Sequence, residues 1–205
     1  MTIQLENISK RFGFEWIFKK IDFQFEAGGK YAIVGPNGSG KSTLLKIISG
    51  GATPTAGKVI YQHENKSVED ETLTSKDIAY AAPYISLIED FTLSELYDFH
   101  TAFKSMKSNS KNEFMELSQL GMHQQKYIKN FSSGMKQRLK LSLAFLTDSS
   151  VLLLDEPTSN FDTKAIDWYL NLIHQFTQDR LVLIGSNQTY EYDFCDRKLA
   201  IQDYK

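Results

Sequence analysis

The sequence has 205 residues, of which 41% are hydrophobic and 23% are charged, and its formal net charge is −2. This size and composition predict one folded domain with its own core and exclude a largely disordered chain. The charge balance provides no general basic field for nucleic acid, and no apolar stretch approaches the roughly 20 residues of a membrane-spanning helix.

The first residues lack the basic and apolar regions of a secretory leader, and the single cysteine, Cys195, cannot form an internal disulfide. Both features indicate a reducing cytosol. We expect Cys195 to be a small packing residue. The histidines show no metal-ligand spacing, so we expect them to be surface residues: His63, His100, His123 and His174.

The first third of the chain alternates predicted strands with one helix. Apolar and polar residues alternate over 2–8 and 21–25, which predicts two strands. A turn follows at 27–30, and residues 30–34 then have the character of a short buried strand. An apolar run at 44–48 predicts a helix over about 42–49, which the glycines after it end.

The segment between the buried strand and this helix fits the phosphate-loop pattern G-x-x-x-x-G-K-[ST]. Glycines let the backbone curl so that its N–H groups point at phosphates, Lys41 adds a positive charge, and the Ser42 hydroxyl can ligate Mg²⁺. A glycine-rich turn that binds nothing is the alternative, and the strand–loop–helix order argues against it. The sequence predicts nucleotide contacts from Gly35, Pro36, Asn37, Gly38, Ser39, Gly40, Lys41, Ser42 and Thr43.

Further strands are predicted at 58–61 and 78–82, joined by a polar, exposed hairpin connection over 62–76. Apolar spacing from Thr92 to about Phe103 predicts a helix, with Thr92 and Glu95 placed to form a capping box. Another helix is predicted at about 112–120. We expect these helices to form an insert within an α/β core.

A helix predicted over 134–147 begins with Ser132, Ser133 and Gly134. Serine hydroxyls and free backbone N–H groups at a helix start can bind an anion. This signal is weak by itself, because many helices begin with serine and bind nothing.

The apolar run 151–154 predicts a buried strand that ends in Asp155 and Glu156. In a phosphate-loop protein, Asp155 is placed to hold Mg²⁺ and Glu156 to activate the attacking water. Two acids in a surface turn are the alternative, which the phosphate loop upstream argues against.

The order and spacing of these motifs resemble the nucleotide-binding subunit of ATP-binding cassette (ABC) transporters, over nearly the whole chain. Residues 35–43 resemble the Walker A loop, 151–156 the Walker B strand, 131–135 the signature and 159–162 the D-loop. The resemblance implies an α/β fold in one domain, 1–205: a P-loop NTPase core with a mainly parallel sheet, an antiparallel β layer from 2–30 and 57–82, and a helical subdomain at about 85–147.

The resemblance also implies ATP and Mg²⁺ as cofactors, and ATP hydrolysis that drives transport of an unknown substrate through a separate membrane permease. A head-to-tail homodimer would hold ATP between the Walker A loop of one copy and the signature of the other. Phe12 would stack on adenine, with an ordinary core phenylalanine as the alternative. We expect no nucleic-acid partner, no insertion of the chain into the membrane, and a cytoplasmic location at the inner face of the membrane.

Four positions depart from the family pattern. The signature has Ser133 in place of its first Gly and Met135 in place of Gln, Tyr84 takes the place of the loop glutamine, and Asn187 takes that of the switch histidine after the strand at 181–184. An amide can donate a hydrogen bond but cannot become cationic. These departures leave open a slow or regulatory ATP-clamp module. The lack of long insertions and of a basic stripe argues against a nucleic-acid ATPase.

Overall fold

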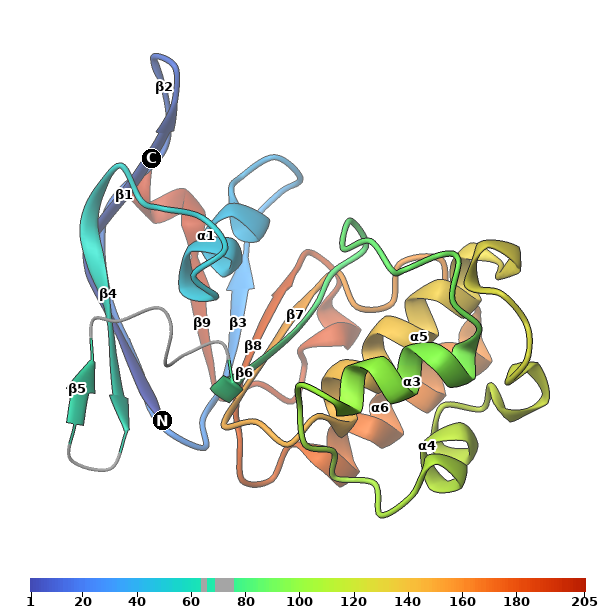
Figure 1. The fold of residues 1–205 in the computed structure, drawn as a ribbon. Coiled ribbons are helices and arrows are strands. Elements are labelled where there is room, and N and C mark those ends of the chain that lie inside the picture. Colours follow the sequence, from blue (N-terminus) through green and yellow to red (C-terminus); the bar gives the residue numbers. More distant parts are fainter. Residues whose placement is uncertain (64–65, 69–75) are drawn as a thin grey trace. The chain divides into compact units, whose positions relative to one another are not determined.

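The computed structural model describes residues 1–63, 66–68 and 76–205 (Figure 1). The chain forms two compact units. The sheet unit comprises residues 1–80, 149–156 and 177–205, and the helical unit comprises residues 81–148 and 157–176. Each unit has its own hydrophobic core.

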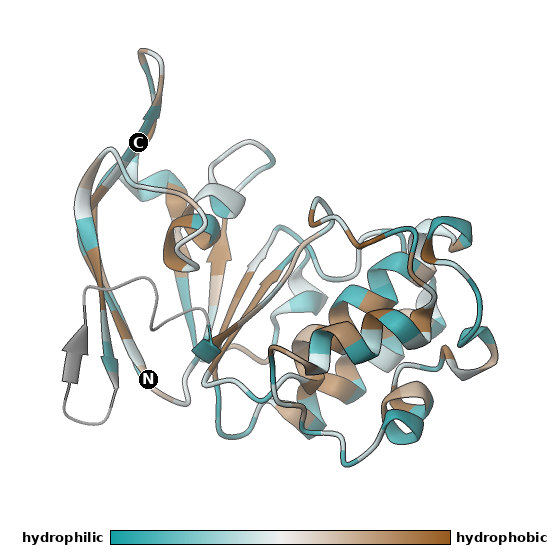
Figure 2. Cartoon of the chain, in the orientation of Figure 1, coloured by the Kyte–Doolittle hydropathy of each residue, from teal (hydrophilic) through white to brown (hydrophobic). Residues whose placement is uncertain are grey.

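A five-stranded sheet has the strand order β6-β7-β8-β3-β9, and the pairs β7–β8, β8–β3 and β3–β9 are parallel. Every residue of β7 and β8 is buried, as expected for parallel strands that are covered on both faces. Figure 2 shows hydrophobic residues concentrated along these strands. The strands are β3 (Lys30–Val34), β6 (Ile78–Ala81), β7 (Val151–Asp155), β8 (Leu181–Ser186) and β9 (Arg197–Ala200).

An antiparallel sheet has the order β2-β1-β4-β5, with strands β1 (Thr2–Phe12), β2 (Glu15–Phe25), β4 (Ala56–His63) and β5 (Lys66–Val68). Gly57, in β4, has a φ of 83°, and a Cβ there would lie 2.3 Å from the carbonyl oxygen of Glu6 in β1. Only glycine therefore lets β4 approach β1 this closely. Helix α1 (Lys41–Ile48) buries Leu44 and Leu45 in the core that β1, β2 and the parallel strands share.

The helical unit contains α3 (Leu93–Thr101), α4 (Lys111–Leu117), α5 (Ser133–Leu146) and α6 (Thr163–Phe176), with 3₁₀ turns at Gly121–His123 and Ile128–Asn130. Its core joins apolar faces of α3, α4 and α5, including Leu96, Phe114 and Leu139. The predicted capping box is confirmed: the Thr92 side chain accepts from the Glu95 backbone, and the Glu95 carboxylate accepts from the Thr92 backbone. No helix among the described residues is long and apolar enough to span a bilayer.

The predicted α/β fold class is confirmed, with corrections to its details. The strand expected at 78–82 within the antiparallel layer lies instead beside β7 in the five-stranded sheet. Of the hairpin connection expected over 62–76, residues 64–65 and 69–75 lie outside the described residues. Residues 66–68 form β5, which pairs antiparallel with β4. Helix α6 and strand β9 had no counterpart in the sequence prediction.

Two single-residue expectations have different outcomes. His100 is not a surface residue, because it is half-buried and its Nε2 lies 2.8 Å from Thr147 Oγ1; burial lowers its pKa. Cys195 is partly buried, as a packing residue should be. Burial, aided by Asp196, raises the pKa of its thiol to about 12.

Candidate nucleotide-binding site

The phosphate-loop segment connects the carboxyl end of β3 to the amino end of α1 in the sheet unit. Gly38 and Gly40 have φ values of 77° and 112°, which side-chain-bearing residues rarely adopt. A Cβ on Gly40 would lie 2.5 Å from Cγ2 of Ile17 in β2. The loop can therefore take this shape, pressed against β2, only with glycine at position 40.

Lys41 is the first residue of α1, and it is 4% exposed. Its Nζ donates to the carbonyl oxygens of Gly35, at 3.0 Å, and Pro36, at 3.2 Å. The ammonium group therefore lies against the loop. The first turn of α1 contains no acidic residue, and its N-cap, Gly40, provides no side-chain acceptor. Backbone N–H groups and the helix dipole thus remain suited to an anion.

The register of the parallel strands brings three chain segments to the same edge of the sheet. Val34 at the end of β3 pairs with Ser186 at the end of β8, and Asp155 at the end of β7 pairs with Gly185. A Cβ on Gly185 would lie 3.2 Å from Asp155 Oδ1 and 3.6 Å from Lys41 Cβ. The phosphate loop, the two acids and the segment after β8 therefore meet at this edge.

Asp155 and Glu156 differ in their surroundings. Asp155 is 1% exposed, whereas Glu156 is partly exposed. Glu156 has a φ of 42°, an uncommon conformation for a residue with a side chain, and its N–H donates to the Gly185 carbonyl oxygen at 2.9 Å. Such conformations occur where the surrounding structure imposes them, often at functional sites. The Glu156 backbone is thus held to the strand that leads to Asn187.

Asn187 is joined to the phosphate loop directly. Its Nδ2 donates to Oδ1 of Asn37 at 3.0 Å. The two residues are 150 positions apart in the sequence, so only the fold brings them together. The sheet unit therefore assembles Lys41, Asp155 and Asn187 from three separate segments.

Phe12, a predicted site residue that is distant in sequence from the phosphate loop, lies at the end of β1, in the β1–β2 hairpin. Phe12 is 59% exposed, and Lys10 Nζ lies 5.1 Å from the centre of its ring. The alternative of a core phenylalanine is therefore wrong. An exposed ring at the end of a strand is free to receive a planar partner.

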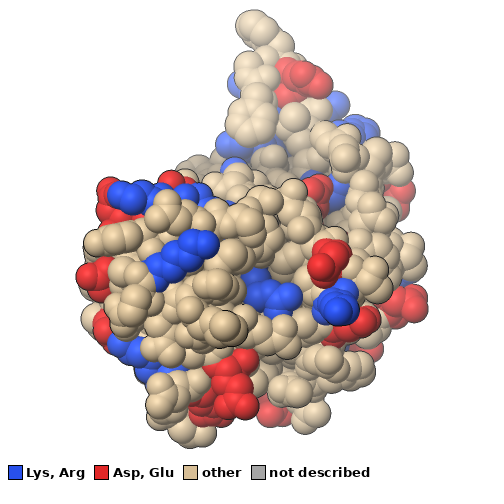
Figure 3. Space-filling view, turned by 90° about the vertical axis from the view of Figure 1, so that its right-hand side faces the viewer, with Lys and Arg blue, Asp and Glu red and all other residues tan. Residues whose placement is uncertain are grey.

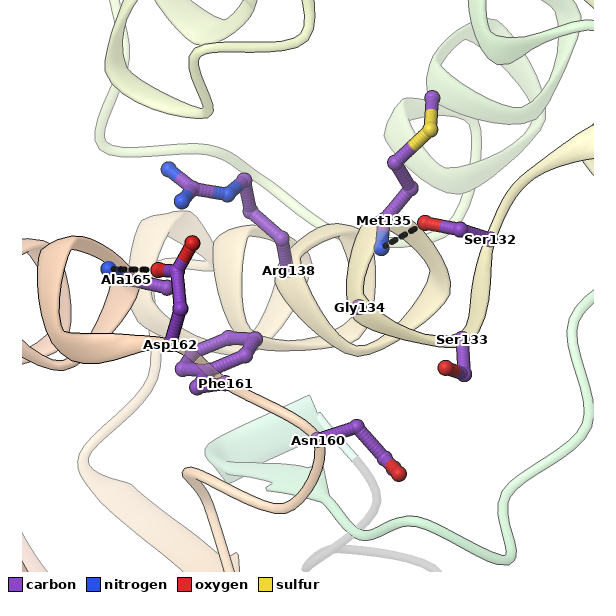
Figure 4. A pocket seen from close by; sticks show the side chains of 9 residues that line it. All are labelled: Ser132, Ser133, Gly134, Met135, Arg138, Asn160, Phe161, Asp162 and Ala165. Atoms are coloured by element: carbon purple, nitrogen blue, oxygen red, sulfur yellow. Dashed lines mark hydrogen bonds between the residues drawn. The ribbon is translucent and has the colours of Figure 1, made fainter.

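The helical unit contains a separate pocket of about 380 Å³ at the start of α5 (Figure 4). Ser132 is the N-cap of α5, and its Oγ accepts the backbone N–H of Met135 at 3.2 Å. A Cβ on Gly134 would lie 3.3 Å from the Asn160 carbonyl oxygen, so a side chain there would crowd the pocket wall. The lining residues are Ser132, Ser133, Gly134, Met135, Arg138, Asn160, Phe161, Asp162 and Ala165.

Arg138 provides the positive charge of this pocket. Its guanidinium carbon lies 4.4 Å from the centre of the Trp168 ring, and its Nη1 donates to Gln119 Oε1 at 2.7 Å. Burial lowers the pKa of this guanidinium, and Asp162 opposes that shift. Asp162 in turn accepts the backbone N–H of Ala165 at 2.8 Å, near the start of α6. Residues 132–135 of the predicted signature and 160–162 of the predicted D-loop thus line one pocket.

Two of the residues that depart from the family pattern, Met135 and Tyr84, lie in the helical unit. Met135, which replaces glutamine, packs against the hydrophobic core of that unit. Tyr84, also in place of glutamine, is 44% exposed and follows buried Ala81 and Ala82. The Pro83 carbonyl oxygen, beside Tyr84, accepts a hydrogen bond from Lys140 of α5.

Charged side chains on the helical side of the molecule are mixed rather than segregated. Figure 3 shows basic and acidic groups interspersed over this face. Within the helical unit, ion pairs join Lys136 to Glu89 and Lys111 to Asp98. Over the described part of this face, no continuous basic stripe for nucleic acid is visible.

The sequence analysis missed a buried polar pair behind Asn187. Ser186 and Glu191 are both buried and share a hydrogen bond. Their five-residue spacing spans a strand end and a 3₁₀ turn, and no local pattern marks such a contact. The one sequence feature that could have indicated the pair Ser186–Glu191 is an acidic residue in the first turn after a buried strand.

A mainly parallel five-stranded sheet with a phosphate loop after one strand and paired acids after another defines a P-loop nucleotide-binding protein. The ABC transporter family model matches residues 18–159, which is more than half of the chain. The chain belongs to the ABC transporter family of ATP-binding cassettes.

Several known proteins resemble this chain. The sulfate/thiosulfate import ATP-binding protein CysA of Nitrosomonas europaea is 28% identical over 96% of this chain, and the lantibiotic transport ATP-binding protein SrtF of Streptococcus pyogenes is 28% identical over 90%. The chain spans 57% of the length of the former and 79% of the latter, and 56–62% of five CysA relatives. It therefore covers less than two thirds of many relatives.

The fold also matches a solved dimeric structure of a bacterial ABC transporter cassette. The TM-score is 0.82 with 24% sequence identity, and the match covers 97% of this chain and 94% of that chain. At this identity the likeness shows the ABC ATPase fold alone.

Proposed function

We propose that this protein is an ATP-binding and ATP-hydrolysing subunit that powers transport of a substrate through a separate membrane permease. The observation that carries the proposal is the convergence of Lys41, Asp155 and Asn187 at one edge of the parallel sheet. The names of its relatives support a transport role, and they cover both an import and a lantibiotic transport system. Neither the substrate nor the direction of transport follows from them.

The phosphate loop would bind the triphosphate of ATP. Apart from Pro36, which has no N–H, residues 35–40 offer backbone N–H groups before α1, while Lys41, Ser42 and Thr43 offer an ammonium and two hydroxyls. Lys41 would exchange its carbonyl partners for the β- and γ-phosphates, because charge-assisted hydrogen bonds are the stronger ones. Phe12 would stack on the adenine ring.

Ser42 and Asp155 would hold Mg²⁺. A hydroxyl and a carboxylate are the hard oxygen ligands that this ion prefers. Gly185 keeps the space beside Asp155 open, because a Cβ there would lie 3.2 Å from Oδ1. When bound, the ion would neutralise charge on the β- and γ-phosphates.

Glu156 would act as the general base for the attacking water. It is partly exposed, and its backbone is fixed to β8 by the bond to Gly185. An ionised carboxylate near the terminal phosphate can orient the water and accept its proton. Asn187 would contribute an N–H donor to the phosphate during the reaction.

The pocket at the start of α5 would complete the site in a second copy of the chain. Ser132, Ser133 and Gly134 lie at a helix N-terminus, where hydroxyl and N–H groups suit a γ-phosphate. A head-to-tail homodimer would therefore contain two composite ATP sites. Docked to a permease, this dimer would lie in the cytoplasm at the inner face of the membrane.

A slow or regulatory ATP clamp is the second candidate. The hydrogen bond between Asn187 and Asn37 favours it, because an amide held on the phosphate loop cannot carry the positive charge of a histidine. Such a module would bind ATP and dimerise with little turnover.

Glu156→Gln tests the proposal against this alternative. The variant removes the proposed base and should slow phosphate release by orders of magnitude, while ATP affinity by calorimetry stays nearly unchanged. Glu116→Gln, an exposed acid in α4, is the matched control and should keep wild-type turnover. Equal turnover in Glu156→Gln and wild type would contradict the proposed role, and ATP-dependent dimerisation without turnover in either would favour the clamp.

A further inference from the structure

The last residue of β8, Ser186, is completely buried and has two hydrogen bonds. Its Oγ donates to Oε2 of Glu191 and accepts the backbone N–H of Gln188, the latter at 2.9 Å. These bonds close the chain on both sides of residue 187. The backbone turn that carries Asn187 is therefore held from behind.

Glu191 ends the 3₁₀ turn Thr189–Glu191 and is 2% exposed. Burying a carboxylate is costly unless hydrogen bonds compensate for the lost water. An apolar pair would fill the same space without that cost, but it could not fix the direction of the Gln188 N–H. The polar pair is thus explained by control of the backbone rather than by packing.

On the opposite side of this turn, Asn187 reaches the phosphate loop. A primary amide carries two N–H groups on its nitrogen. One of them is used by Asn37 Oδ1, at 3.0 Å. The other remains available to a ligand of the loop, provided that the backbone at 187 keeps the amide in this place.

We propose that Ser186 and Glu191 are positioning residues that hold Asn187 between the phosphate loop and the terminal phosphate of ATP. The inference rests on the proposed ATPase function. It names the residues that set the geometry of the segment after β8, which carries Asn187 to the site. Both residues are buried, so neither would touch the nucleotide. Their effect on turnover passes entirely through Asn187.

A double-mutant cycle tests this dependence. Ser186→Ala should lower kcat roughly tenfold, because small displacements of a reacting-site group are costly, with little change in KM. In the Asn187→Ala background, the same substitution should have no further effect on kcat. Ser186→Ala should lower Tm in both backgrounds, because the hydrogen bonds of Ser186 to Glu191 and Gln188 are lost in each.

Two controls separate positioning from general destabilisation. Ser9 is also buried, and its Oγ accepts the backbone N–H of Lys20 at 2.8 Å in the antiparallel sheet. Ser9→Ala should therefore lower Tm without lowering kcat. Glu191→Gln keeps an acceptor for Ser186 and should retain most of the wild-type kcat, whereas Glu191→Leu should behave like Ser186→Ala.

The possible outcomes are distinguishable. Equal losses of kcat from Ser186→Ala with Asn187 present and absent would overturn the positioning role while leaving the ATPase function intact. A loss of kcat in Ser9→Ala as large as that in Ser186→Ala would overturn it as well, by showing a stability effect. A wild-type protein without turnover would instead overturn the proposed function, and the inference with it.

Discussion

At position 187, an asparagine and a histidine differ in charge and in the number of hydrogen-bond donors. A histidine can become cationic while negative charge develops on a transferring phosphoryl group, whereas Asn187 stays neutral. Asn187 compensates in part with two N–H groups, one of which is bound to Asn37. Chemistry at this residue should therefore depend on hydrogen bonding rather than on protonation.

We expect Asn187→His to raise kcat and Asn187→Ala to lower it, both with little change in ATP affinity. Loss of one well-placed donor at a reacting centre costs up to about 3 kcal/mol, or roughly a hundredfold in rate. Steady-state phosphate release by the three proteins under one condition measures the effect. Identical rates for Asn, His and Ala would mean that residue 187 is only a structural turn position.

At the scale of elements, the capping box at the start of α3 links stability to pH. Hydrogen bonds from the backbone and side chain of Thr92 lower the pKa of the Glu95 carboxyl below its ordinary 4.5. A carboxyl with a depressed pKa in the folded state stabilises the fold above its unfolded pKa. That contribution is lost as the pH falls through the folded value.

Glu95→Gln should therefore have a lower Tm than the wild type at pH 7, and the difference should shrink as the pH falls below 4.5 and through the folded pKa. Thr92→Ala should lower the stability of α3 by about 1 kcal/mol, as is typical for loss of an N-cap. Thermal unfolding at both pH values measures these effects, with Glu116→Gln as the control for a general charge change. A Tm difference that is the same at pH 7 and pH 3 would contradict the assignment.

Elements with a strong local signal were predictable from the sequence, and long-range pairings were not. The strand at 30–34 matches β3, and the helix expected at 134–147 matches α5 within one residue at each end. The strand at 78–82 was assigned to the wrong sheet, because its apolar residues suit either sheet and only pairing with β7 decides. Helix α6 was missed although Ala165, Trp168 and Leu172 have helical spacing.

The candidate site divides in the same way. The phosphate loop and the two acids are contiguous motifs whose chemistry can be derived from a few neighbouring residues. The bond from Asn187 to Asn37 and the pair Ser186–Glu191 depend on how strand ends meet. A sequence without its fold contains no information on such distances.

At the scale of the whole molecule, the proposed homodimer makes each ATP site depend on two chains. Lys41→Ala should disable the phosphate loop, and Gly134→Asp should disable the pocket at α5 by adding an acidic side chain beside the Asn160 carbonyl. Each variant alone should hydrolyse little ATP. A mixed dimer would retain one intact site, with the phosphate loop of one variant and the α5 pocket of the other.

Phosphate release should therefore recover when the two variants are mixed. With random pairing and independent sites, about half of the dimers are mixed and each has one intact site of its two. The activity should therefore approach roughly a quarter of the wild-type value. Mixing each variant with buffer alone is the baseline. Mixtures that stay at the sum of the separate activities, although light scattering shows dimers, would contradict a composite site.

The partly buried thiol of Cys195 gives the protein a practical property. With a pKa of about 12, the thiol is ionised to only a very small extent at neutral pH, and thiolate is the form that attacks maleimides and iodoacetamides. Because the sequence contains no other cysteine, such labels should react slowly with the native chain. A cysteine introduced at fully exposed Met122 would carry a fluorophore at a single defined position. Energy transfer between two labelled copies could then follow their association in real time, without removal of the natural cysteine.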